Sequence, residues 1–183
     1  MEKPADHPLT LLERRRLLAA VALFSGFAAD MLEELAGAVR ERKLVASETL
    51  FQAGETSDEM FVVVEGTLEV FLKRGGRRIE LTRLGAGDWC GEMPLLTGEP
   101  RSATVAATTE SRVLEINRAT MARLFHQEPG LMETLSRNLV ARKRANASVI
   151  RETQSEAAPA PKPVLEAHVG LLEQMRNWFK TGK

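Results

Sequence analysis

Residues Gly91 to Val105 read GEMPLLTGEPRSATV. A carboxylate, Glu92, stands near the start of this stretch, and a guanidinium, Arg101, stands near its end. Pro94 lacks a backbone N–H and suits the first turn of a helix, whereas Gly98 suits the position that ends one. The spacing therefore predicts a short helix between the two charged residues, beginning at the glycine before the carboxylate.

This predicted helix suits a ligand that carries both an anion and hydroxyl groups. Free N–H groups at a helix N-terminus attract anions, Arg101 adds a charged fork that matches phosphate oxygens, and Ser102 adds a hydroxyl donor. Glu92 would repel a simple phosphate, but it can accept hydrogen bonds from the hydroxyl groups of a ribose. The alternative is a surface helix on which Glu92 and Arg101 pair across a turn. The residues alone leave both interpretations open.

Short stretches rich in β-branched and aromatic residues surround this segment. Turn-forming glycines separate them between Lys43 and Ile116, a pattern typical of a compact antiparallel barrel or sandwich. In Thr67 to Leu72 the alternation places Leu68 and Val70 on one face. The strand-like stretches are TLFQ, MFVVVEGTLEVFL, RRIELTRL, SATVAA and SRVLEI.

Helical spacing of apolar residues occurs before and after this β region. Asp30 is expected to cap a helix in the N-terminal part, and Asn117 is expected to cap a short one at Arg118 to His126. Pro129 suits the first turn of a longer helix that reaches Glu152. A polar Pro/Ala linker should follow, and then an amphipathic helix from Val164 to Phe179.

The composition excludes several classes of function. The chain has 25 basic and 25 acidic residues, so no overall field draws it to nucleic acid or to a membrane surface. Its single cysteine, Cys90, cannot form an internal disulfide, which fits a reducing cytoplasm. The most apolar run, Leu17 to Ala29, is shorter than the ~20 residues of a spanning helix. Scattered histidines predict no metal site, and the absence of a catalytic triad pattern argues against an enzyme.

The opening stretch resembles the phosphate-binding cassette of the cyclic nucleotide-binding domain family, which includes the catabolite activator and the regulatory subunit of cyclic-AMP-dependent kinase. The similarity runs from Leu18 to Asn146 and includes VALFSGF, GETSDEMFVVVEGTLEV and LGAGDWCGE. The sequence is most similar to the cytoplasmic domain of bacterial cyclic-nucleotide-gated and mechanosensitive channels. It departs from the family at Cys90, where Phe is common, and at Pro94, where a small residue is common.

The resemblance implies a mainly β fold with flanking α-helices. An eight-stranded β-roll (a double-stranded β-helix or jelly roll) would carry N-terminal helices and a C-terminal lid helix. The expected division is N-terminal helices in residues 1–40, the roll in 41–117 with the cassette at 90–105, and hinge and lid helices in 118–152. The linker then occupies 153–163 and the amphipathic helix 164–183.

The resemblance also implies the ligand contacts. Glu92 would bind the ribose 2′-hydroxyl, and Arg101 and Ser102, with N–H groups around Gly91, would bind the cyclic phosphate. A gap-free extension of the match places Arg142 where channel-type domains stack an arginine on the purine, although it could equally lie on the solvated face of its helix. The full set of expected ligand-binding residues is Gly91, Glu92, Met93, Arg101, Ser102, Ala103, Arg142 and Val70.

These expectations describe a sensor of cyclic AMP or cyclic GMP without a cofactor, cytoplasmic or at the cytoplasmic face of a membrane. Too few residues follow Thr153 for a helix-turn-helix, so direct DNA binding is not expected. The expected partner is a channel pore, another protein, or a second copy of the chain bound through the last helix. The last helix should bury its apolar stripe on the roll, a second copy or a membrane, and its linker should keep it independent of ligand. The alternative is a degenerate roll that binds no ligand and serves as an interaction module.

Overall fold

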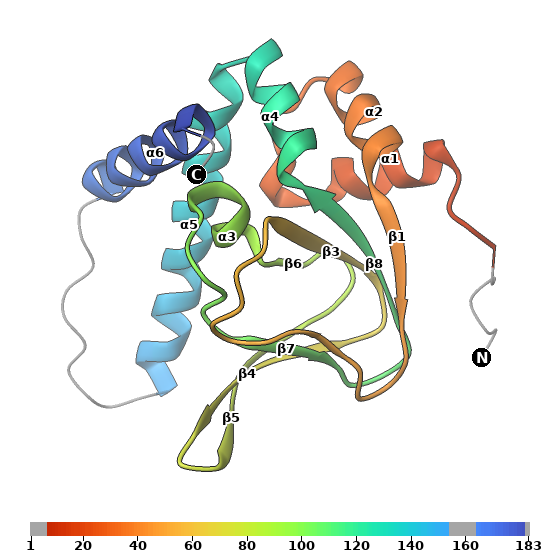
Figure 1. The fold of residues 1–183 in the computed structure, drawn as a ribbon, viewed down its shortest axis with the longest axis vertical. Helices are drawn as coiled ribbons and strands as arrows, with labels where there is room; N and C mark the ends of the chain where they lie inside the picture. The colour runs from red at the N-terminus through yellow and green to blue at the C-terminus, as the bar shows by residue number, and fades with distance from the viewer. Residues whose placement is uncertain (1–6, 154–163, 182–183) are drawn as a thin grey trace.

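Two four-stranded antiparallel sheets form the β-roll at the centre of the molecule (Figure 1). The computed structural model describes residues 7–153 and 164–181, with side chains except at 74, 142–153 and 164–166. One sheet has the order β1-β8-β3-β6 and the other β2-β7-β4-β5. The strands are β1 (Arg40–Leu44), β2 (Thr49–Phe51), β3 (Glu59–Glu65), β4 (Leu68–Arg74), β5 (Arg77–Leu84), β6 (Trp89–Cys90), β7 (Thr104–Ala107) and β8 (Ser111–Asn117).

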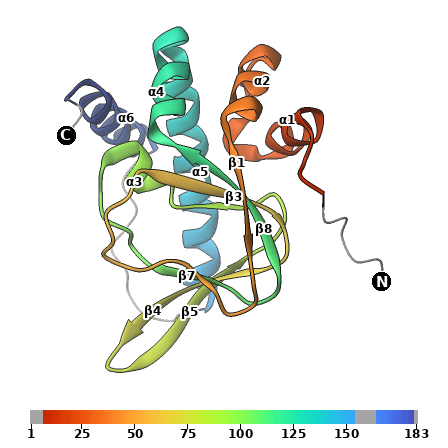
Figure 2. The same ribbon diagram turned by 45° about the vertical axis from the view of Figure 1, so that its right-hand side comes forward.

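Helices cover the first of these sheets and surround one end of the roll, as Figures 1 and 2 show. They comprise α1 (Leu11–Ala20), the 3-10 turn η1 (Ala22–Phe24), α2 (Ala29–Ala38), α3 (Glu92–Thr97), α4 (Arg118–Gln127), α5 (Gly130–Thr153) and α6 (Val164–Thr181). This architecture confirms the expected β-roll with N-terminal and C-terminal helices. None of the helices within residues 7–153 and 164–181 combines the length and apolar character needed to cross a bilayer.

The strands β3 and β8 separate two hydrophobic cores. Met60 and Val62 point from β3 into the core shared with the helices, whereas Phe61 and Val63 point into the interior of the roll. Because successive side chains of a strand face opposite sides, a strand buried on both faces is apolar without alternation. This double burial explains the unbroken run MFVVV in the sequence.

Several local predictions can be compared with the structure. The Asn117 side chain accepts a hydrogen bond from the Thr120 N–H at 2.9 Å, which confirms its role as the cap of α4. The prediction for Asp30 is wrong, because Ala28 occupies the N-cap position of α2 and Asp30 lies in its first turn. The Asp30 carboxylate accepts instead from the N–H of the next residue, Met31.

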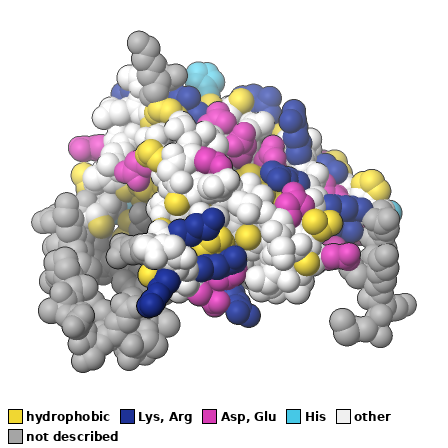
Figure 3. All heavy atoms as spheres, turned by 60° about the horizontal axis from the view of Figure 1, so that its bottom comes forward, with side chains coloured by type: hydrophobic (Ala, Val, Ile, Leu, Met, Phe, Trp, Pro, Cys, Tyr) yellow, Lys and Arg dark blue, Asp and Glu magenta, His cyan; other side chains and the backbone are white. Residues whose placement is uncertain are grey.

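The hairpin of β4 and β5 projects from the roll at the lower end of Figure 1. Its outer strand is exposed along almost its whole length, and Figure 3 shows Lys and Arg side chains gathered on this end of the molecule. Arg78 pairs with Glu69 and Arg83 with Glu80. Charged side chains on an open strand edge disfavour pairing with another chain.

The last helix lies against the rest of the chain. It packs on α3 and α5, and its residues Leu171 and Met175 belong to the core that the helices share with the first sheet. Of the destinations expected for its apolar stripe, the structure therefore shows the chain's own roll and helices. The expectation that this helix responds little to ligand stays a prediction, and its contacts with α3 place it beside the cassette helix.

Candidate ligand-binding site

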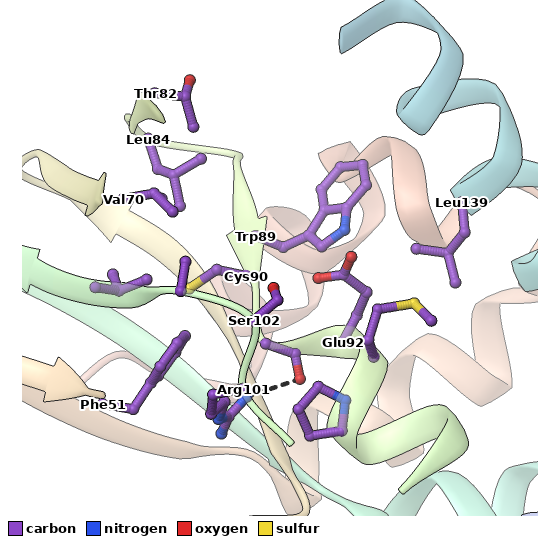
Figure 4. Close-up of a pocket in the computed structure, with 15 residues that line it drawn as sticks. Phe51, Val70, Thr82, Leu84, Trp89, Cys90, Glu92, Arg101, Ser102 and Leu139 are labelled. Atoms are coloured by element: carbon purple, nitrogen blue, oxygen red, sulfur yellow. Dashed lines mark hydrogen bonds between the residues drawn. The ribbon is translucent and has the colours of Figure 1, made fainter. Parts of the chain in front are cut away.

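A cavity opens between the roll, α3 and α5, and Figure 4 shows the side chains around it. Every expected ligand-binding residue except Arg142 lines it. Arg142 lies on α5, and its side chain is outside the described residues. The lining consists of Phe51, Val70, Thr82, Leu84, Trp89, Cys90, Gly91, Glu92, Met93, Pro94, Arg101, Ser102, Ala103, Val105 and Leu139. The cassette, residues 90–105, thus forms one wall of the cavity.

The short helix α3 begins and ends as its sequence predicts. Gly91 and Gly98 flank it, both in the left-handed region, with φ of 77° and 75°. Pro94 lies in its first turn. A Cβ atom at Gly91 would lie 2.0 Å from Nη1 of Arg101, so glycine is required both for the backbone conformation and for the approach of the guanidinium. Gly91 therefore positions the helix and the cation together.

Arg101 is a buried cation at the edge of this cavity. Its residue is 3% exposed, its Nη1 donates to the Gly91 carbonyl oxygen at 2.9 Å (dashed in Figure 4), and its guanidinium stacks 4.0 Å from the Phe51 ring centroid. Its nearest carboxylate oxygen belongs to Glu59, at 3.9 Å. Within the described residues its Nε has no hydrogen-bond partner. The side chain therefore retains donor capacity in a desolvated place.

The burial of Arg101 affects its titration. Desolvation lowers the pKa of Arg101 because it disfavours the charged form, and nearby groups, led by Cys90 and Glu59, act in the opposite direction. A guanidinium stays protonated near neutral pH even when its pKa falls. Arg101 thus carries a fixed positive charge, and an anionic ligand would offset the free-energy cost of its desolvation.

Glu92 and Ser102 line the same cavity, and Glu92 does not form the surface pair with Arg101 that the alternative interpretation required. Glu92 is half-buried, Ser102 is exposed, and Figure 4 shows the Glu92 carboxylate turned away from α3 toward the labelled cavity residues. Arg101 is buried and meets Gly91 and Glu59 rather than Glu92. The interpretation of this segment as an ordinary surface helix is therefore wrong.

Sequence reasoning missed part of the cavity wall. Thr82 of β5 lies opposite Val70 of β4, which was among the expected ligand-binding residues. Residues opposite each other on paired strands share a face, so Thr82 could have been predicted from Val70. Phe51, Trp89 and Leu139 reach the cavity through tertiary packing and carry no comparable signal. Cys90, which stands where Phe is common in the family, is buried in the roll core.

The comparisons with known proteins point to one family. The family model described as cyclic nucleotide-binding domain matches residues 41–128. A cyclic nucleotide-gated potassium channel of Mesorhizobium japonicum is 36% identical over 133 residues, which cover 73% of this chain and 36% of the channel. The chain spans about a third of the length of the channel relatives that it matches.

Solved structures give the same result. A cyclic nucleotide-binding-like protein from Brucella abortus is 29% identical with a TM-score of 0.57, and the match covers 62% of this chain and 97% of that one. The regulatory domain of Toxoplasma gondii PKA, solved with cAMP, is 25% identical with a TM-score of 0.61, covering 74% of this chain and 49% of that one. These similarities show that the chain belongs to the cyclic nucleotide-binding domain family, a family of regulatory ligand-binding domains.

Proposed function

We propose that this chain binds a cyclic nucleotide, cyclic AMP or cyclic GMP, in the cavity beside α3 and acts as a regulatory domain. The observation that carries the proposal is Arg101, a buried cation that lines the cavity and whose Nε has no hydrogen-bond partner among the described residues. A cyclic phosphate carries a negative charge to pair with the guanidinium and oxygen atoms to accept its hydrogen bonds.

The remaining groups suit the sugar and the base. The Glu92 carboxylate can accept from the ribose 2′-hydroxyl, and Ser102 can donate to the phosphate. The apolar wall formed by Val70, Leu84 and Leu139 suits the face of a purine. Arg142, on the part of α5 beyond Leu139, stays the proposed stacking partner of the base.

The proposed output is a change in the position of α5. Leu139 of α5 already lines the cavity, so ligand contacts there would favour one arrangement of the lid helix over another. The recipient would be a protein partner, such as a channel pore or a second copy of the chain. The interpretation as an interaction module without ligand is less well supported, because it gives no role to the unused donor of a buried arginine that lines a cavity.

Isothermal titration calorimetry on the full chain tests the proposal. Cyclic AMP and cyclic GMP should each be titrated, with 5′-AMP as a control that carries the same base and a doubly charged, open phosphate. We expect saturable binding of at least one cyclic nucleotide and much weaker binding of 5′-AMP. A folded chain that binds neither cyclic nucleotide would favour the interaction module.

The role of Glu92 can be tested separately with a ligand that lacks one hydroxyl. Glu92→Ala should weaken binding of the cyclic nucleotide more than Glu92→Gln, because the amide oxygen still accepts a hydrogen bond. The 2′-deoxy analogue should lose affinity for the unmodified chain but little more for Glu92→Ala. Calorimetry on all four combinations gives the coupling, and additive losses would show that Glu92 does not contact the ribose.

A further inference from the structure

The end of α6 is attached to the cassette helix through Trp178. The indole Nε1 donates to the Leu95 carbonyl oxygen at 3.0 Å, and the ring lies so close to Gly98 that a Cβ atom there would be 2.6 Å from it. Carbonyl groups in the last turn of a helix have no partner within the helix, so Trp178 satisfies one of those of α3. The helix α6, in contrast to α3, lies outside residues 41–128, which match the family.

The same tryptophan is held from the other side by α4. Nη2 of Arg118 donates to the Trp178 carbonyl oxygen at 2.8 Å, and its guanidinium lies 4.1 Å from the indole centroid. The next residue, Phe179, meets Phe125 of α4 edge-on, with ring centroids 5.0 Å apart. Trp178 therefore contacts both the end of α3 and the start of α4.

Contacts along α6 also fix the first half of α5. Met175 is fully buried in the shared core, Ser136 donates through its hydroxyl to the His168 carbonyl oxygen at 3.3 Å, and Arg176 pairs with Glu133 at 3.3 Å. Leu139, which lines the ligand cavity, is three residues beyond Ser136 and so on the same side of α5.

The helix α6 thus contacts both α3 and α5, two elements that form walls of the cavity. The cassette helix α3 supplies Glu92, Met93 and Pro94, and α5 supplies Leu139. Figures 1 and 2 both show α6 beside α3 and α5. Ordering such walls before the ligand arrives removes a cost that binding would otherwise bear.

We propose that α6 is a positioning helix for the ligand site and that Trp178 is its main positioning residue, so that docking of α6 and binding of the nucleotide stabilise each other. The inference rests on the proposed function. Coupling between two sites is reciprocal, so a helix that raises the affinity for ligand must itself be held more firmly when ligand is bound. This reciprocity separates a positioning role from a merely structural one.

The first test measures affinity for cyclic AMP by calorimetry on full-length variants. Trp178→Ala should weaken binding about ten-fold, within the usual range of coupling between sites. Trp178→Phe, which keeps a ring but loses the N–H donor, should weaken it less. Gln174→Ala, on the exposed face of the same helix, should bind like the unmodified chain. Thermal unfolding without ligand establishes that each variant is folded.

The second test needs no substitution and decides the matter even if Trp178→Ala fails to fold. Amide hydrogen exchange of the unmodified chain should slow in residues 167–181 when cyclic AMP is added. A chain that binds cyclic AMP with no change in exchange there, or a folded Trp178→Ala variant with unchanged or higher affinity, would overturn the inference while leaving the proposed function standing. A chain that binds no cyclic nucleotide would instead remove the proposed function, and this inference with it.

Discussion

Arg101→Met is expected to reduce the affinity for cyclic AMP by tens- to thousands-fold while leaving the chain folded. Truncating one partner of a buried, hydrogen-bonded charge pair costs roughly 2–5 kcal/mol, which corresponds to such a loss of affinity. Methionine is an unbranched apolar side chain that can fill part of the space beside Phe51, where the guanidinium now stacks, while the charge is removed. Calorimetry measures the affinity, and thermal unfolding confirms the fold.

Two further substitutions separate charge, shape and packing at this position. Arg101→Lys keeps the charge but not the planar fork, so it should bind more weakly than the unmodified chain and more tightly than Arg101→Met. Arg101→Ala also removes a buried stem and should lower the melting temperature as well as the affinity. Equal affinities for the unmodified chain and Arg101→Met would mean that the cassette does not hold the phosphate.

The segment that could be read best from sequence is the one whose structure depends on local rules. Gly91, Pro94 and Gly98 each impose a backbone conformation that no neighbour needs to enforce, and α3 begins and ends where they predict. The cap at Asn117 is equally local. The candidate site was accessible for the same reason, because most of its polar groups lie within one short stretch of chain.

The features that were missed depend on distant contacts. Strand β1 reads RERKL and has no apolar alternation, and it is a strand because it pairs with β8. Asp30 has the chemistry of a cap, but the preceding Phe27 packs into the core and the helix starts at Ala29. The position at which α6 docks could not be predicted from the sequence, because Trp178 contacts residues 60 and 83 positions away, Arg118 and Leu95.

The charged composition of β1 leads to a prediction about stability. Arg112 of β8 is 5% exposed, and it lies 3.4 Å from Oε1 of Glu41 in β1 and 3.2 Å from Oε1 of Glu65 in β3. Its Nη1 also donates to the His7 carbonyl oxygen, and Glu41 accepts from the Leu9 N–H at 2.9 Å. One buried cation therefore joins two strands to the segment that leads into α1.

Arg112→Met is expected to lower the free energy of unfolding by about 3–5 kcal/mol, because it leaves two carboxylates near each other without their cation. Arg83→Met is the matched control, since its exposed pair with Glu80 should contribute no more than about 1 kcal/mol. Urea denaturation measures both, and Glu41→Gln combined with Arg112→Met should cost less than the sum of the two single changes. Neither Arg112 nor Glu41 lines the ligand cavity, so the affinity of folded Arg112→Met for cyclic AMP should stay that of the unmodified chain. A loss for Arg112→Met no larger than that for Arg83→Met would show that this network does not hold β1 in the sheet.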